Sequence, residues 1–256
     1  MPASSFEIDG ATLEVLRLPG DSPARPTLVL LHEGLGSVGL WRDLPQRLHA
    51  RTGCGIFAYS RRGNGFSSVL EEARAPDYMH REALQTLPRL LDAAGIERPI
   101  LVGHSDGASI ALIFAGAHPR EPRALVLLAP HVFVEEISLR SIAAIGTTYR
   151  AGVLRERLAR HHRDVDHTFY AWHDIWLAPS FRDWNIEEYL ARIEAPAVLV
   201  QGRQDEYGTR AQLDAIERAM LAPCDRVVLD RCGHSPHRDR PAAVETIVAA
   251  TAQAGW

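Results

Sequence analysis

One segment of the chain reads PILVGHSDGASIALIFAGA, from Pro99 to Ala117. Its first five residues form a short apolar run that predicts a buried parallel strand, and residues 105–117 predict a strongly apolar helix. Between them, residues 103–107 (GHSDG) match the pattern G-x-S-x-G. A strand, a sharp turn and a helix form the context in which this pattern exposes a serine hydroxyl above a sheet. The competing interpretation of Ser105 is an ordinary capping serine at a turn.

The alternation of strand and helix patterns continues on both sides of this segment. Residues 6–18 predict a hairpin around Asp9-Gly10. Further strands are expected at Thr27–Leu31, Gly55–Tyr59, Ala124–Leu128, Ala197–Gln201 and Arg226–Leu229. Helices are expected near Trp41–Arg51, Tyr78–Ala94, Gln212–Leu221 and Pro241–Ala252. Strands that alternate with helices predict an α/β fold with a mostly parallel central sheet flanked by helices.

Residues 131–185 interrupt this alternation. They contain no convincing strand pattern, and their apolar residues recur at helical spacing. We therefore interpret residues 131–185 as a helical insertion, and residues 1–130 and 186–256 as the α/β core that carries it.

A nucleophilic serine needs a base and an acid that orients the base. In folds that use G-x-S-x-G, these residues follow in the chain order Ser, Asp or Glu, His. Asp205 ends the run VLVQGRQD beyond the insertion, and His234 lies just past the last predicted strand. Because open α/β sheets place their sites at the carboxyl ends of the strands, we expect Ser105, Asp205 and His234 to meet. Taken singly, Asp205 and His234 are equally well read as ordinary loop residues.

From Thr27 to Ala252 the chain resembles the α/β-hydrolase superfamily. The resemblance rests on residues 103–107 and on three further stretches: LLHEGLG (30–36), SRRGNGFS (60–67) and GHSP (233–236). The second stretch is similar to the family's D-x-R-G-x-G-x-S loop, with Ser60 in the place of Asp. The resemblance implies an α/β-hydrolase fold in which residues 131–185 form a helical cap.

The resemblance also implies an oxyanion hole made of two backbone N–H groups. One belongs to the residue after the nucleophile, Asp106, and the other to the loop after the first core strand. This chain departs from the family pattern there, because Glu33 stands between His32 and Gly34. We choose Gly34 as the second donor, with Leu35 as the alternative.

Two carboxylates, Glu33 and Asp106, are expected near that hole. Their charges would oppose an oxyanion unless they were paired or directed away. Asp106 lies in the first turn of a helix, where a carboxylate is favoured. We hypothesise that Glu33 pairs with Arg61 or Arg62, and an unpaired surface glutamate is the alternative.

Composition excludes several classes of function. All 28 basic residues among the 256 are arginines, so no lysine can form a Schiff base or bind phosphate in a P-loop. The net charge of −4 disfavours a nucleic-acid binder. The three cysteines form neither a disulfide framework nor a zinc motif. The stretch 161–167 (HHRDVDH) fits no zinc spacing, and 63–65 (GNG) lacks the third glycine of a dinucleotide fingerprint. We expect no metal and no cofactor.

These features predict a cofactor-free serine hydrolase that cleaves carboxylic esters, with a small-molecule ester and water as its partners. Cleavage of a carbon–carbon bond, lactone, thioester or amide by the same residues is the alternative, and a ligand receptor with this fold is a further one. No apolar run is long enough to span a bilayer, and residues 1–18 do not resemble a signal peptide. We expect no membrane partner and a cytoplasmic location. The sequence does not indicate an oligomeric state.

Overall fold

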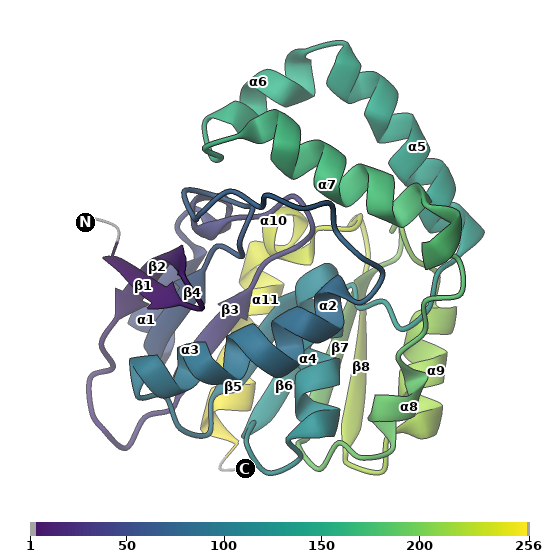
Figure 1. Cartoon of the computed structure of the whole chain (residues 1–256). Coiled ribbons are helices and arrows are strands. Elements are labelled where there is room, and N and C mark those ends of the chain that lie inside the picture. The colour runs from purple at the N-terminus through teal and green to yellow at the C-terminus, as the bar shows by residue number, and fades with distance from the viewer. Residues whose placement is uncertain (1–3, 255–256) are drawn as a thin grey trace.

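The computed structural model describes residues 4–254, so residues 1–3 and 255–256 of the predicted core lie outside the described part. A single eight-stranded sheet runs through the molecule in the order β1-β2-β4-β3-β5-β6-β7-β8 (Figure 1). The pairings β1–β2 and β2–β4 are antiparallel, and all others are parallel. The strands are β1 (Ser4–Ile8), β2 (Ala11–Leu18), β3 (Thr27–Leu31), β4 (Gly55–Tyr59), β5 (Ile100–His104), β6 (Ala124–Leu128), β7 (Ala197–Gly202) and β8 (Cys224–Leu229). The predicted fold class is confirmed.

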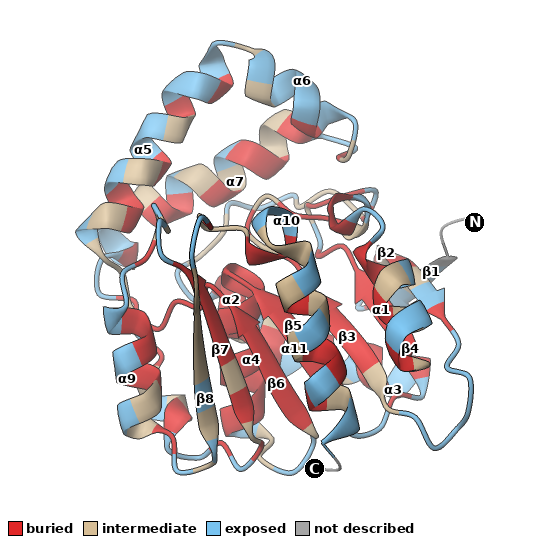
Figure 2. Cartoon of the chain, turned by 180° about the vertical axis from the view of Figure 1, so that it is seen from behind, coloured by how far each residue is buried: buried red, intermediate tan, exposed pale blue. Residues whose placement is uncertain are grey.

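Helices cover both faces of this sheet (Figures 1 and 2). Along β3, Leu28 and Leu30 belong to one apolar cluster and Val29 and Leu31 to the other, since side chains alternate across a strand. The first cluster packs against α1 (Leu44–Thr52) and α11 (Pro241–Gln253). The second packs against α2 (Tyr78–Arg81), η2 (Glu82–Thr86), α3 (Leu87–Ala94), α4 (Asp106–Ala117), α8 (Glu187–Leu190) and α9 (Ala211–Ala219).

Two predicted helices differ from the observed ones for local backbone reasons. The helix expected from Trp41 is instead a short 3-10 turn, η1 (Val38–Trp41), followed by α1. Arg42 separates them because its φ of 54° is incompatible with a right-handed helix. The helix expected over 78–94 contains a π-helical turn, η2, and Pro88, which has no N–H to donate to the preceding turn, follows it.

The interrupting segment forms α5 (Glu136–Arg150), α6 (Val153–Ala159), α7 (Val165–Leu177) and η3 (Pro179–Phe181). These helices lie above the carboxyl end of the sheet (Figures 1 and 2). An isolated bridge between Phe133 and Asn185 joins the two ends of the segment. No helix among residues 4–254 is long and apolar enough to cross a membrane.

Helix α4 is central because almost its whole length, Asp106–Gly116, is buried. It packs against the sheet and also against η2 and α8, which explains why its sequence is apolar all round rather than amphipathic. The first residues of this helix are therefore held by packing on every side.

Replacement of Phe114 on α4 tests this packing. Phe114 is 0% exposed, so Phe114→Ala should lower the free energy of unfolding by about 3–5 kcal/mol, through lost transfer energy and a cavity. Leu221 is 86% exposed, so Leu221→Ala should change the free energy of unfolding by less than about 0.5 kcal/mol. Urea denaturation of both variants measures the difference, and equal midpoints would contradict the assignment of α4 as the packed centre.

Candidate active site

Ser105 lies at a sharp turn between β5 and α4. Its backbone has φ 52° and ψ −119°, a conformation that is strained for a residue with a side chain. A Cβ atom at Gly103 would lie 2.5 Å from the carbonyl oxygen of Gly107, and one at Gly107 would lie 2.0 Å from that of Leu31. Both contacts are too short for any side chain. The two glycines of G-x-S-x-G are thus required by close backbone packing around the serine.

The structure brings Ser105, Asp205 and His234 together. His234 Nε2 lies 2.9 Å from Ser105 Oγ, and His234 Nδ1 lies 2.8 Å from Asp205 Oδ1. A carboxylate only accepts hydrogen bonds, so Nδ1 carries the proton and Nε2 is free to accept the serine proton. Ser105 follows β5, Asp205 follows β7 and His234 follows β8, so all three come from the carboxyl ends of parallel strands.

The surroundings of Asp205 and His234 determine the pKa values of these two groups. Burial acts to raise the pKa of Asp205, but the charge and hydrogen bond of His234 and the N–H of Tyr207 lower it to about 2. Burial acts to lower the pKa of His234, but the charge and hydrogen bond of Asp205 outweigh it, aided by Glu206 and Glu33, and raise this pKa above 6.5. Asp205 is therefore an anion that favours a proton on His234.

The carbonyl groups of the loop after β3 accept hydrogen bonds from protein side chains. Arg61 donates to the carbonyl oxygens of His32 (2.5 Å) and Glu33 (2.8 Å). Asn64 donates to the carbonyl oxygens of Gly34 and Gly36 (3.0 Å each). His162 donates to the carbonyl oxygen of Leu35 (3.1 Å). Within residues 4–254 the N–H groups of Gly34 and Leu35 have no acceptor, and both residues line the cavity beside Ser105. The N–H of Asp106, at the start of α4, likewise has no partner within the helix.

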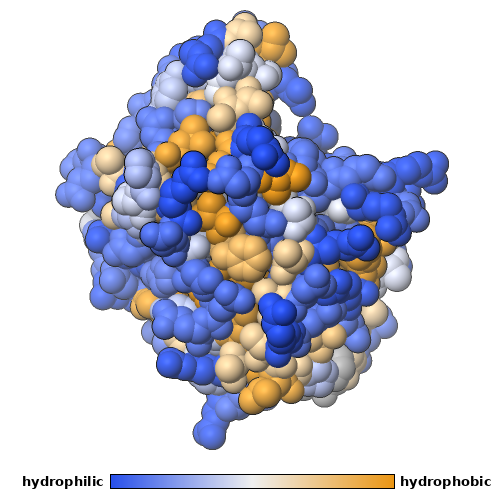
Figure 3. Space-filling model, turned by 90° about the vertical axis from the view of Figure 1, so that its right-hand side faces the viewer, coloured by the Kyte–Doolittle hydropathy of each residue, from blue (hydrophilic) through white to orange (hydrophobic). Residues whose placement is uncertain are grey.

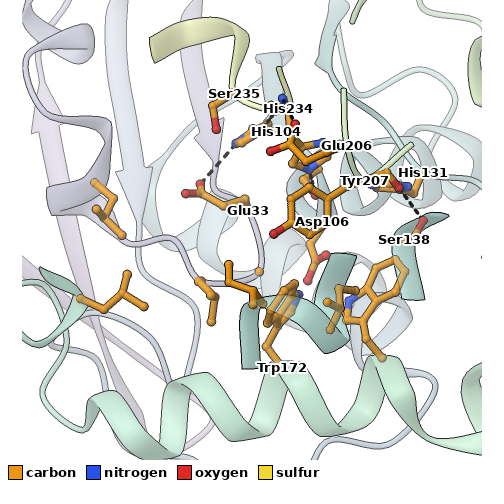
Figure 4. Close-up of a pocket in the computed structure, with 18 of the residues that line it drawn as sticks. Glu33, His104, Asp106, His131, Ser138, Trp172, Glu206, Tyr207, His234 and Ser235 are labelled. Carbon is orange, nitrogen blue, oxygen red and sulfur yellow. Dashed lines mark hydrogen bonds and ion pairs between the residues drawn. The ribbon is translucent and has the colours of Figure 1, made fainter. Parts of the chain in front are cut away.

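The hypothesis that Glu33 pairs with Arg61 or Arg62 is wrong. The Glu33 carboxylate lies 3.1 Å from Nη2 of Arg238 and 3.4 Å from Nδ1 of His104, as Figure 4 shows for His104. Arg61 instead holds main-chain oxygens of the same loop, and Arg62 donates to the oxygen of Val69. Glu33 is held by charged and polar partners, so it is not an unpaired surface glutamate either.

The Asp106 carboxylate is bound by groups that sequence reasoning missed. The hydroxyl of Tyr78 donates to Asp106 Oδ2 at 2.5 Å, and Trp176 Nε1 donates to the Tyr78 oxygen at 3.1 Å. Burial and the charge of Asp106 raise the pKa of Tyr78 well above 10, so Tyr78 stays a neutral donor. Tyr78 and Trp176 belong to α2 and α7, and nothing in their local sequence connects them to Asp106.

The departure at Ser60 is compensated by a carboxylate from another strand. Ser60 Oγ donates to Glu14 Oε2 at 2.6 Å and accepts from the N–H of Val38 at 2.9 Å. The same Glu14 oxygen accepts from the N–H of Phe66 at 3.0 Å. Glu14 on β2 thus places a carboxylate beside position 60, where the pattern D-x-R-G-x-G-x-S has an aspartate.

A cavity of about 240 Å³ lies between Ser105 and the helices above it. Its polar side includes His131, Ser138, Glu206, Tyr207 and Arg238. Its apolar side is formed by Leu35, Leu40, Ile142, Ile145, Leu154, Leu158, Trp172 and Trp176. Trp172 points from α7 into this space (Figure 4), and hydrophobic atoms gather where the insertion overhangs the core, with hydrophilic atoms around them (Figure 3). The site therefore presents the hydroxyl of Ser105 to a chamber with one apolar and one polar side.

No metal centre is formed by the described residues, since none of them make up a group of three or more His, Cys, Asp or Glu side chains placed to hold an ion. The histidine-rich stretch 161–167 is spread over a turn and the start of α7. There His162 binds backbone groups of two core loops.

Comparison with known proteins identifies the family. A model of the alpha/beta hydrolase family matches residues 28–247. A putative carbamate hydrolase of Klebsiella pneumoniae (strain 342) is 29% identical over 224 residues, which cover 82% of this chain and 74% of the relative. A proline iminopeptidase of Lactobacillus delbrueckii subsp. lactis is 26% identical over 112 residues, 43% of this chain and only 38% of the relative's length.

Among solved structures, the 2-hydroxy-6-oxo-6-phenylhexa-2,4-dienoate hydrolase of Rhodococcus sp. strain RHA1 has a similar fold. Its TM-score is 0.81 at 19% identity, with 98% of each chain covered. This likeness extends to nearly the full length of both chains, and the family model covers most of the sequence. The chain therefore belongs to the alpha/beta hydrolase family.

Proposed function

We propose that this protein is a cofactor-free serine hydrolase that cleaves carboxylic esters of small molecules with water. The observation that carries the proposal is the hydrogen-bonded chain Ser105–His234–Asp205 beside a cavity whose cap side is apolar. A serine hydroxyl is a weak nucleophile alone, and a neutral imidazole with its Nε2 lone pair on the hydroxyl activates it.

The reaction follows from these positions. Ser105 Oγ attacks the acyl carbon while His234 Nε2 takes its proton, and Asp205 stabilises the imidazolium that forms. The tetrahedral oxyanion is bound by the N–H groups of Asp106 and Gly34, with Leu35 as the alternative second donor. Each such donor contributes about 3–4 kcal/mol of transition-state stabilisation. His234 then protonates the leaving alcohol, and water activated by His234 releases the acid from the acyl-enzyme.

Residues 131–185 act as a cap in this proposal, on a core of residues 1–130 and 186–256. Support comes from the bridge that joins the ends of the segment and from the apolar side chains that α5, α6 and α7 contribute to the cavity. Ile142, Leu154 and Trp172 are examples. An apolar wall of this kind suits the hydrocarbon part of an ester. A cytoplasmic location is proposed with it, because the described cysteines are all free.

The similar proteins include a putative carbamate hydrolase, a proline iminopeptidase and a 2-hydroxy-6-oxo-6-phenylhexa-2,4-dienoate hydrolase. Hydrolysis of amides, thioesters, lactones and carbon–carbon bonds next to a carbonyl passes through the same kind of tetrahedral state. Cleavage of one of these bonds in place of esters is therefore the alternative outcome of the activity test below. A receptor would bind an ester and release its product slowly or not at all.

Replacement of the nucleophile tests the proposal most directly. Wild-type protein should turn over p-nitrophenyl esters repeatedly, and Ser105→Ala should lower kcat by about 10⁴- to 10⁶-fold, because the covalent step is lost. Initial rates over a series of acyl lengths measure this, and thermal unfolding checks that the variant is folded. Equal rates in the two proteins would refute the role of Ser105.

The pH profile tests the base. An imidazolium cannot accept the serine proton, so kcat/KM should rise with pH through an apparent pKa above 6.5, the direction set by Asp205 and its neighbours. Glu206→Gln removes one of the charges that raise this pKa and keeps an oxygen for the N–H of His234, so the profile should shift to lower pH. A profile that does not move in this variant would argue that another group titrates.

The cap wall should set acyl preference. Ile142 lines the cavity and is 1% exposed, so Ile142→Ala should shift the optimum to longer acyl chains. Each methylene that gains an apolar site contributes about 0.8 kcal/mol, or roughly a fourfold gain in kcat/KM. Val153→Ala, on the exposed side of α6, is the matched control and should leave the optimum in place. The same optimum in both variants would mean that the acyl group binds elsewhere.

A further inference from the structure

We propose that His162, in the turn between α6 and α7, is a positioning residue that holds the oxyanion-binding loop (residues 33–36) in its active arrangement. The proposal rests on the function proposed above and assigns to the cap a part in catalysis besides enclosing the substrate. Among the residues that the structure describes, His162 makes the side-chain hydrogen bond that joins the cap directly to this loop.

Both ring nitrogens of His162 are used, and their partners define the proton position. Nδ1 lies 2.9 Å from the N–H of Gly65 and must accept, while Nε2 lies 3.1 Å from the carbonyl oxygen of Leu35 and must donate. The ring is buried, and burial lowers its pKa to about 4, so it stays neutral near pH 7. A neutral ring in this one tautomer makes both bonds at once.

The effect of His162 reaches the N–H of Gly34 through one turn of backbone. The carbonyl of Leu35 and the N–H of Gly36 share one planar peptide group, so holding the first orients the second. The N–H of Gly36 in turn donates to the carbonyl oxygen of Glu33 at 2.9 Å. That carbonyl shares its peptide plane with the N–H of Gly34. A bond from His162 thus helps to aim the Gly34 donor at the space above Ser105.

The neighbouring peptide is held from the core. Asn64 donates to the carbonyl oxygens of Gly34 and Gly36, and its own oxygen accepts from Arg74 at 2.9 Å. Since the carbonyl of Gly34 shares a plane with the N–H of Leu35, Asn64 orients the alternative donor. His162 and Asn64 therefore hold consecutive carbonyls of the loop, one from the cap and one from the core.

The cap is attached to the core near His162 by other bonds that do not reach the loop. Thr168 Oγ1 donates to the carbonyl oxygen of Gly63 at 2.6 Å, and the N–H of Arg163 donates to that of Gly65 at 2.8 Å. These bonds anchor the α6–α7 end of the cap to residues 61–68. They separate two roles experimentally, because Thr168 anchors the cap and, among the described residues, forms no hydrogen bond with residues 33–36.

Three variants distinguish positioning from general anchoring. His162→Asn keeps an acceptor at the place of Nδ1 but loses the donor to Leu35. His162→Gln restores a donor at the place of Nε2. Thr168→Val removes the anchor at Gly63 and is the matched control. We would measure kcat and KM on p-nitrophenyl butyrate, thermal unfolding, and amide hydrogen exchange of the peptide that contains residues 33–36.

The proposal predicts that His162→Asn lowers kcat by about 10- to 100-fold with little change in KM, as expected for a misplaced transition-state contact. His162→Gln should recover most of the rate, and Thr168→Val should keep the wild-type kcat. Exchange at the N–H of Gly36, which donates to the Glu33 carbonyl within this loop, should increase in His162→Asn only. An unchanged kcat in His162→Asn, or an equal loss in Thr168→Val, would overturn the positioning role.

The exchange measurement separates this proposal from the proposed function. If the wild-type protein hydrolyses no ester, the esterase proposal fails, and faster exchange in His162→Asn still supports the link between His162 and the loop. If the wild-type protein is active but exchange and kcat are both unchanged in His162→Asn, the esterase proposal stands and the positioning role is wrong.

Discussion

The site depends on the close contact between Gly107 and the end of β3. A side chain at position 107 would come within 2.0 Å of the carbonyl oxygen of Leu31, so α4 can approach that strand only with glycine there. This approach places the start of α4, with the N–H of Asp106, beside the loop that carries Gly34. The strained backbone of Ser105 is maintained because α4 is packed on every side and cannot relax. The nucleophile and the candidate donor at Asp106 are thus positioned by one packing constraint.

Carboxylates surround a site that is proposed to stabilise negative charge, and each of them has a partner. Asp205 is bonded to His234, Glu33 to Arg238 and His104, and Asp106 to Tyr78. Bound in this way, Glu33 and the Oδ2 atom of Asp106 face protein donors, which limits their repulsion of an oxyanion, whereas the buried Oδ1 of Asp106 has no hydrogen-bond partner among the described residues. The charges of Asp205, Glu206 and Glu33 favour a proton on His234, the residue that must accept one during attack. The electrostatics of the site are therefore consistent with acyl transfer.

The segment above the sheet contributes to the site in two different ways. Its helices supply apolar side chains such as Ile142 and Trp172 to the cavity, and these contacts are non-directional and tolerate ligands of different shape. The turn between α6 and α7 instead supplies directional hydrogen bonds from His162 to core loops. The apolar cavity wall and the directional hydrogen bonds to the core thus come from different parts of one segment.

The sequence by itself determined the α/β alternation and the parallel sheet, because strand and helix periodicity is a local signal. The local pattern G-x-S-x-G singled out Ser105, whereas Asp205 and His234 were chosen from their order in the chain and their places at the ends of predicted strands. The break at Arg42 and the π-helical turn within residues 78–94 could not be placed, since they depend on a single dihedral angle and on a local shift of the helical hydrogen bonds. Only the tertiary structure decided the partners of the polar groups. Glu33 meets Arg238 from 205 positions away, and Asp106, Leu35 and Ser60 likewise meet residues of distant elements. Such pairings carry no local pattern, because folding of the whole chain brings the partners together.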